Sequence, residues 1–287
     1  MSHIAYVNGQ YVNHADAAIH IEDRGYQFAD GVYEYAAFFN GVLLDAEPHL
    51  KRLKRSLDEL AIDTGHTLDT LPFIIRELIA KNHRQSGAIY IQVSRGTAKR
   101  DHAFPGDVPT NVVVTLRGGK MVPLAEAQKG VKVITMPENR WNRCDIKSIA
   151  LLANVLTKQE AISQGAKETW LYRQDGSITE GSVSNAFLIK DNVIHTHPLT
   201  ESILPGITRN TALTMAKELG IQLKEEAFNL LDIKEADEAF TTSTSVNVQP
   251  VTQIDDNILG DGTCGPICKQ LMSAFSDYIF KQTGKQW

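Results

Sequence analysis

Short apolar segments separated by two-residue turns constrain the fold of this chain more than any other feature. Asn8-Gly9 lies between Tyr6 and Val12, and Asn40-Gly41 separates the apolar segment 32–39 from 42–44. Asn-Gly is typical of a two-residue β-hairpin turn, so both places predict hairpins. Further strands are expected over 89–94, 112–116, 131–135, 169–172, 186–189 and 239–242. Because strands outnumber helices and many connections are short, the pattern predicts a mixed α+β architecture and not a doubly wound parallel sheet.

Apolar residues at helical spacing predict the helices that accompany these strands. One helix is expected to open at Pro48, and others cover 71–79, 208–219 and 267–280. A chain of 287 residues is long enough for two domains. We expect a small N-terminal α/β domain over 1–117, an interdomain linker over 118–130 and a larger C-terminal domain over 131–287, because glycine and Pro123 punctuate the middle segment.

The composition argues against several classes of protein. The formal net charge is -5 and no long basic tract is present, so nucleic acid and membranes are not expected partners. No apolar run approaches the ~18 residues of a membrane helix, and the first nine residues do not have the pattern of a signal peptide. The cysteines, Cys144, Cys264 and Cys268, are odd in number and lack Cys-x-x-Cys spacing. We therefore expect a cytoplasmic protein without disulfides or a metal site.

Lys147 is the candidate catalytic residue. It follows the aromatic and basic segment 140–146 and precedes the apolar residues 149–156, which are expected to begin a helix with Ser148 as its N-cap. The positive end of a helix dipole disfavours an ammonium group, and a neutral amine attacks carbonyl groups. The alternative is a solvated surface lysine, the commoner situation for this residue type.

Glu180 follows the lysine and precedes Gly181 at an expected turn that leads into an apolar strand. A carboxylate in such a place can keep the ring nitrogen of pyridoxal 5'-phosphate (PLP) protonated, which the ring requires to act as an electron sink. An exposed turn glutamate is the alternative. A reactive lysine followed by an acid on a glycine turn suggests a PLP enzyme.

Three features could bind the phosphate of PLP. The segment 204–208 leads into a helix whose first amides attract anions, although it could be a simple Pro-Gly turn with Thr208 as the cap. The hydroxyl run 241–245, which includes Thr244, could donate to phosphate or form a polar strand edge. Arg52 adjoins the apolar Leu53 and could turn inward to bind phosphate in a fork, or belong to a solvated basic helix face.

The loop 95–105 carries three cations and a histidine within eight residues. Arg100 and His102 could trap a substrate carboxylate, the arginine through two parallel hydrogen bonds and the histidine as a further donor. Tyr33, at the start of an expected strand, could donate its phenol to the same group. The alternatives are a solvated basic loop and a half-buried strand tyrosine.

With these residues in view, the chain resembles the fold-type IV (class IV) PLP-dependent aminotransferases, and within them the bacterial D-amino acid (D-alanine) group. The resemblance runs nearly end to end. It is carried by the segments 22–28, 30–34, 95–98, 143–148, 179–182 and 206–209. Each segment is weakly specific alone, and together they are highly specific.

The resemblance implies a two-domain α+β fold whose larger C-terminal domain binds PLP around a barrel-like core. Lys147 then bonds to the cofactor and moves the substrate α-proton, and Glu180 pairs with the pyridine nitrogen. Leu204 packs against the ring. The implied phosphate ligands are Arg52, the backbone of Ile207 and Thr208, and Thr244.

The same resemblance implies how the substrate is bound. Tyr33, Arg100 and His102 bind its carboxylate, and the Arg-x-His pair comes from the neighbouring subunit of a homodimer. The implied reaction is ping-pong transamination of a D-amino acid, of the D-alanine type, with a 2-oxo acid such as 2-oxoglutarate or pyruvate. Neither a branched-chain L-aminotransferase nor an aminodeoxychorismate lyase, the alternative enzymes, needs Arg100 with His102. A non-catalytic PLP carrier is the alternative outside the enzymes.

Two positions depart from the pattern of this group. Ala29 replaces a glycine before Asp30-Gly31, where one methyl group is expected to matter little. Val183 replaces a serine in the segment 180–185, so the resemblance defines the tightness of cofactor binding and the range of accepted side chains less sharply than the reaction type.

Overall fold

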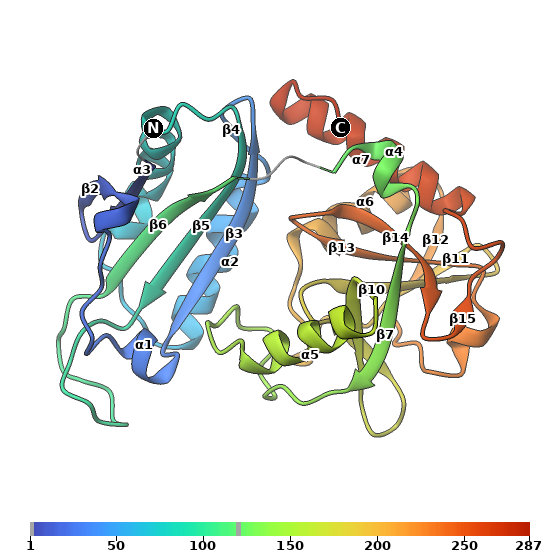
Figure 1. The fold of residues 1–287 in the computed structure, drawn as a ribbon, viewed down its shortest axis with the longest axis horizontal. Helices are drawn as coiled ribbons and strands as arrows, with labels where there is room; N and C mark the ends of the chain where they lie inside the picture. Colours follow the sequence, from blue (N-terminus) through green and yellow to red (C-terminus); the bar gives the residue numbers. More distant parts are fainter. Residues whose placement is uncertain (1–2, 119–121) are drawn as a thin grey trace. The chain divides into compact units, whose positions relative to one another are not determined.

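The computed structural model describes residues 3–118 and 122–287, and its internal contacts divide it into two compact units (Figure 1). The first unit comprises Met1–Lys120, Ile146–Ala150 and Gln282–Lys285, and the second comprises Met121–Asp145, Leu151–Lys281 and Gln286–Trp287. The segment that carries Lys147 is thus grouped with the first unit, although it lies within the sequence range expected for the C-terminal domain. The expected boundaries stay a prediction, and residues 119–121 of the expected linker lie outside the described residues.

Within the described residues, the first unit is built on a six-stranded antiparallel sheet of order β2-β1-β6-β5-β3-β4. Its strands are β1 Ile4–Val7, β2 Gln10–Asn13, β3 Gly31–Phe39, β4 Val42–Leu43, β5 Ser86–Ser94 and β6 Asn111–Arg117. Its helices are α1 Arg24–Phe28, α2 Ala46–Glu59 and α3 Thr67–Lys81. Helix α2 packs on β3, and α3 packs on β1 and β6, so that one apolar cluster joins helices and sheet.

The two Asn-Gly hairpins are confirmed. Asn8 and Gly9 have φ angles of 46° and 92°, and Asn40 and Gly41 have φ angles of 51° and 76°. Positive φ at both central residues is the geometry of the type I′ turn, whose twist matches that of the flanking strands. These turns fix the register of β1 with β2 and of β3 with β4.

Among the described residues, the second unit is built on a nine-stranded mixed sheet of order β12-β11-β10-β13-β14-β7-β8-β9, with β15 paired to β14. Its strands are β7 Val131–Pro137, β8 Glu168–Tyr172, β9 Ile178–Gly181, β10 Asn185–Lys190, β11 Val193–His195, β12 Gln222–Lys224, β13 Glu238–Ser243, β14 Asn247–Ile254 and β15 Asn257–Ile258. Its helices are α4 Leu124–Ala127, α5 Leu152–Ser163, α6 Ile207–Glu218 and α7 Pro266–Thr283, of which the last two residues are grouped with the first unit.

This sheet curls on itself. Strand β9 lies at the end of the strand order, five positions from β10, yet the two lie close together. The apolar side chains of Val133, Trp170, Leu188 and Ala239 come from four different strands and share one core cluster. The expected mixed α+β architecture with a barrel-like core is therefore confirmed.

The helix expected to begin at Ile149, with Ser148 as its N-cap, begins later, so that prediction is wrong. Helix α5 begins at Leu152, and Ser148 does not cap it but bridges to Val32. Residues 147–149 pair instead with the beginning of β3: Tyr33 N donates to Lys147 O at 2.9 Å, and Ile149 N donates to Gly31 O at 3.1 Å. Pairing with a distant strand overrides the local helix propensity of 149–151. The helix-dipole argument for the reactivity of Lys147 therefore does not apply.

Candidate active site

The backbone of Lys147 is held by α2 through its N–H and by β3 through its carbonyl. Its N–H donates to Ser56 Oγ at 3.2 Å, and its carbonyl accepts from Tyr33 N at 2.9 Å. The side chain is half-buried, and its Nζ lies 4.2 Å from the centroid of the Tyr33 ring. The structure therefore places the expected catalytic amine directly beside one of the expected substrate-binding residues, and not on an open surface.

Arg52 turns inward from α2. Its neighbours Lys51 and Lys54 are exposed and pair with Glu47 and Asp58 on the helix surface. Arg52 is only 7% exposed and forms two contacts with Glu34, from Nε to Oε2 at 3.0 Å and from Nη2 to Oε1 at 2.5 Å. It is therefore distinct from the solvated basic face of the same helix.

Glu180 lies inside β9 and not at a turn, so that part of the sequence interpretation is wrong; the turn follows at 182–184. Its carboxylate is buried and accepts three hydrogen bonds, from Arg140 Nη1 at 2.6 Å, Asn185 Nδ2 at 2.9 Å and Leu204 N at 3.0 Å. Burial raises the pKa of Glu180 to about 7, and the neighbouring Arg140 guanidinium opposes part of that rise. The alternative of an exposed turn glutamate is wrong.

Arg140 and Asn185 are components of this network that the sequence did not identify. Arg140 also binds Glu138, from Nη2 to Oε2 at 2.6 Å, and so lies between two carboxylates. Asn185 donates to Leu204 O at 3.0 Å as well as to Glu180. Both residues lie in segments that precede or contain candidate site residues. Nothing in the linear sequence distinguishes them from solvated polar residues.

The N-terminus of α6 has the form of an anion site. Gly206 occupies the N-cap with φ -64° and ψ 133°, and among the described residues no side chain caps the helix. Thr208 is the second helical residue, so its expected alternative role as the cap is wrong. Ile207 and Thr208 are buried at the positions whose amides point out of the helix.

Gly206 is required by a close approach. A Cβ at this position would lie 2.0 Å from Asn185 Oδ1, and Asn185 is itself held by Glu180 and Leu204. Leu204, Gly206 and Glu180 are thus connected through one amide side chain. The segment that carries Leu204 and Gly206 is thus brought together with Glu180, 24 residues before Leu204, in the second unit.

The hydroxyl run 241–245 occupies the end of β13 and the turn that follows, and its members lie in different environments. Thr241 Oγ1 donates to Asn185 O at 2.8 Å and is part of the sheet structure. Thr242 Oγ1 is buried and has no hydrogen-bond partner within the described residues. Thr244 is half-buried in the turn between β13 and β14. A buried hydroxyl without a partner is costly, and the run therefore fits a polar ligand group better than a plain strand edge.

Arg100 and His102 are exposed and gather at one aromatic ring. The Arg100 guanidinium carbon lies 4.9 Å from the Phe28 ring centroid, and the His102 ring lies 5.3 Å from it. Arg24 stacks on the same ring and donates to Asp101 O at 2.6 Å, which fixes the loop. Within the described residues, no hydrogen bond, ion pair or ring contact joins Arg100 or His102 to Tyr33 or Lys147.

Arg95, the first cation of that loop, has a structural role. It is buried and donates to Asp30 at 2.8 Å and to the carbonyls of Leu60 and Ala61 at 2.7 and 2.9 Å. The cluster of three cations that the sequence shows is therefore divided by the fold. Only part of it faces solvent.

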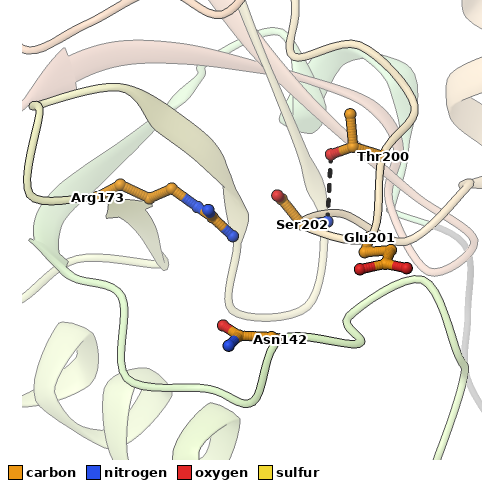
Figure 2. Close-up of a pocket in the computed structure, with 5 residues that line it drawn as sticks. All are labelled: Asn142, Arg173, Thr200, Glu201 and Ser202. Carbon is orange, nitrogen blue, oxygen red and sulfur yellow. Dashed lines mark hydrogen bonds between the residues drawn. The ribbon is translucent and has the colours of Figure 1, made fainter.

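A pocket of about 590 Å³ lies elsewhere in the second unit, lined by Asn142, Arg173, Thr200, Glu201 and Ser202 (Figure 2). None of the expected site residues is among these. The three cysteines are buried and free, and burial raises the pKa of Cys144 to about 12, which disfavours a nucleophilic role. Over 3–118 and 122–287, no His, Cys, Asp and Glu cluster suited to a metal ion is found, and none of the helices in these ranges could cross a bilayer.

The model of the amino-transferase class IV family matches residues 31–254. The chain belongs to the class IV aminotransferase family. Among its relatives are D-alanine aminotransferases, one from Staphylococcus epidermidis that is 42% identical over 96% of this chain and 97% of its own, and one from Bacillus licheniformis that is 42% identical over 97% and 98%.

Solved structures agree with this assignment. The branched-chain amino acid aminotransferase of Escherichia coli superposes with a TM-score of 0.90, at 27% identity, over 100% of this chain and 97% of that one. The branched-chain amino acid aminotransferase of T.th., solved with pyridoxamine 5'-phosphate, gives a TM-score of 0.90 at 25% identity over 100% and 96%. The expected family and fold type are confirmed.

Proposed function

We propose that this protein is a D-amino acid aminotransferase that uses PLP. It transfers the amino group of a D-amino acid, of the D-alanine type, to a 2-oxo acid such as 2-oxoglutarate or pyruvate in a ping-pong cycle. The observation that carries this proposal is the identity of 40–42% over nearly the full chain with D-alanine aminotransferases. The branched-chain enzymes share the fold at 25–27% identity and are the second candidate.

The residues present fit the cofactor. Glu180 is a buried carboxylate suited to a protonated ring nitrogen, and the uncapped start of α6 at Ile207 and Thr208 is suited to a phosphate. We assign the phosphate to these two amides together with Arg52 and Thr244, and we assign the ring face to Leu204. The unpartnered Thr242 hydroxyl, two residues before Thr244, supports the assignment.

The residues of the chain have separate roles in the proposed reaction. PLP, when bound, supplies the electron sink that stabilises negative charge at the substrate α-carbon. Lys147 would hold the cofactor through Nζ until the substrate amine displaces it, and the freed amine would then take the proton from the substrate α-carbon and pass it on. Tyr33 lies beside Nζ and, with Arg100 and His102, binds the substrate carboxylate, which fixes the face of the substrate that the amine meets.

We further propose a cytoplasmic homodimer whose subunits share active sites. Arg100 and His102 are exposed and form no hydrogen bond, ion pair or ring contact with Lys147 within the described residues, which supports a role for them in the active site of the neighbouring subunit. The three unpaired cysteines support a reducing compartment. We retain the domain boundaries 1–117, 118–130 and 131–287, with the last range as the PLP-binding domain.

A substrate panel tests the function. The enzyme is assayed with D-alanine, L-leucine and aminodeoxychorismate, using 2-oxoglutarate as acceptor for the two amino acids. We expect turnover of D-alanine, and Lys147→Ala should lose nearly all of it together with the visible absorption of the bound cofactor. Turnover of L-leucine alone would support the branched-chain alternative. A coloured protein whose spectrum does not change with D-alanine would indicate a carrier.

A further inference from the structure

Glu34 is a fully buried carboxylate on the helix-covered face of β3. It is 0% exposed, while its neighbours Tyr33 and Tyr35 are half-buried on the opposite face, as strand alternation requires. Its charge faces α2, where His49 and Arg52 lie three residues apart on one side of the helix. A buried charge of this kind must be paired and hydrogen-bonded to be tolerated.

Four contacts satisfy Glu34. Arg52 supplies Nε to Oε2 at 3.0 Å and Nη2 to Oε1 at 2.5 Å, and His49 Nδ1 and Tyr35 N each lie 2.9 Å from Oε1. Burial alone would raise the pKa of Glu34, but the Arg52 guanidinium and the His49 hydrogen bond hold that pKa well below its usual range. The carboxylate is therefore an acceptor only, so that His49 Nδ1 carries its hydrogen and donates.

The contact between Glu34 and Arg52 fixes the plane of the guanidinium. Two parallel hydrogen bonds to one carboxylate define both the direction and the rotation of the arginine head group, which a single bond would leave free to turn. Lysine neighbours on the same helix have no such constraint, because their ion pairs are exposed. Within the described part of α2, Arg52 is buried and its guanidinium is oriented by a carboxylate.

We propose that Glu34, supported by His49, is a positioning residue that orients Arg52 for the phosphate of PLP. The inference rests on the proposed function, which assigns Arg52 to that phosphate. Glu34 itself would not contact the cofactor. It acts only through Arg52, by holding the guanidinium in one orientation before the phosphate binds. PLP binding then does not have to restrict the motion of the Arg52 side chain.

The test compares PLP with pyridoxal, which lacks the phosphate. Glu34→Gln keeps the size of the side chain but removes the charge and one acceptor, so Arg52 loses its fixed plane. In the cofactor-free protein we expect the dissociation constant for PLP to rise at least tenfold. The dissociation constant for pyridoxal should stay within about twofold of the wild type, because no phosphate is involved. A parallel loss of both ligands would overturn the inference.

A double-mutant cycle supplies the second readout. If Glu34 acts through Arg52, Glu34→Gln should have no further effect on PLP affinity in an Arg52→Ala background. Additive effects would contradict the proposal. Glu238→Gln is the matched control, because Glu238 is also buried but accepts the amides of Ile267 and Cys268, each at 2.9 Å, at the start of α7. It should leave the ratio of PLP to pyridoxal affinity unchanged.

A second variant tests the proposal if Glu34→Gln does not fold, and the wild type tests the proposed function separately. Should Glu34→Gln fail to fold, Glu34→Asp retains the charge while shortening the side chain, and it should lower PLP affinity selectively as well; unchanged affinity in a folded Glu34→Asp would count against the proposal. Failure of the proposed function has a different signature. There the wild type itself would bind PLP no better than pyridoxal, before any substitution is made.

Discussion

Glu180 makes the stability of the cofactor-free protein depend on pH. Burial raises its pKa to about 7 from an ordinary value of 4.5. Between these values the native state holds a proton that the unfolded state has lost, so the free energy of unfolding falls as pH rises from about 4.5 to about 7 and is level above that. A shift of this size corresponds to about 3 kcal/mol.

Denaturant unfolding of the cofactor-free protein at pH 5 and pH 8 checks this expectation. Glu180→Gln cannot titrate, so its free energy of unfolding should change less between these pH values than that of the wild type, in the direction just given. Identical pH dependence in the two proteins would show that burial does not perturb this carboxylate.

Ala29 is predicted to cost stability, in contrast to the expectation that its methyl group matters little. It is the C-cap of α1 and has φ 55° and ψ 28°, the left-handed region that glycine adopts freely and other residues do not. Ala29→Gly should therefore raise the free energy of unfolding by about 1 kcal/mol.

Ala80→Gly is the matched control for that experiment. Ala80 is exposed and helical within α3, where glycine should lower the stability by about 0.5–1 kcal/mol. The two substitutions are chemically identical and should have effects of opposite sign in thermal or urea unfolding. Equal losses would contradict the argument from backbone conformation.

For individual residues, the sequence indicated those that carry distinctive chemistry. It did not indicate the residues that hold them in place through hydrogen bonds. Lys147 and Glu180 were recognisable because a lysine and an acid in defined segments suggest PLP chemistry. Asn185 and Arg140 were not, because their importance comes from contacts with Glu180 that only the fold creates. Glu34 reads in the sequence as one polar residue in an aromatic strand, and its partner lies 18 positions away.

The geometry at the start of α6 is sensitive to one added methyl group. A Cβ on Gly206 would lie 2.0 Å from Asn185 Oδ1 and 3.2 Å from the Arg209 side chain, and Asn185 is fixed by two hydrogen bonds. Gly206→Ala should lower the stability by about 1–3 kcal/mol and weaken PLP binding, because the helix start must shift. Equilibrium unfolding and PLP titration measure the two effects.

Gly106→Ala is a suitable control for Gly206→Ala. A Cβ at Gly106 would meet no atom within 4 Å, so its effect on stability should stay within about 0.5 kcal/mol. A loss at Gly206 no larger than the loss at Gly106 would show that the approach of Asn185 is not restrictive.

Elements with strong local signals were predicted well from the sequence. The Asn-Gly hairpins and α2, α3, α6 and α7 follow from turn chemistry and apolar spacing. Strand β14 was not foreseen, because Gln249, Pro250 and Gln253 interrupt its apolar pattern and its order in the sheet comes from pairing with β13 and β7. The helix expected from Ile149 begins at Leu152 instead, because residues 147–149 pair with β3, a strand that is distant in sequence.

If the subunits share their active sites, two different inactive variants should regain activity when they form mixed dimers. Lys147→Ala removes the catalytic amine. Arg100→Ala removes the guanidinium that would bind the substrate carboxylate in the active site of the neighbouring subunit. When the two inactive variants are unfolded together and refolded, half of the dimers should contain one copy of each. One site in such a dimer has both groups, so about a quarter of the wild-type activity should return.

Refolding each variant alone provides the control, and light scattering should give the mass of two chains. Activity that stays at the level of the separate variants would place Arg100 in the same subunit as Lys147 and would contradict the shared site. At this scale the sequence predicted the fold type and the family, while the range over which each domain extends stays a prediction, because Ile146–Ala150 is grouped with a unit remote in sequence.

The most direct measurement asks which side chain carries the cofactor. The protein is incubated with PLP and treated with borohydride, which converts the bond between an amine and the cofactor aldehyde into a stable link. Peptide mass mapping then locates the added mass. We expect modification at Lys147, with none in Lys147→Ala. A modification at any other lysine, or none in the wild type, would contradict it.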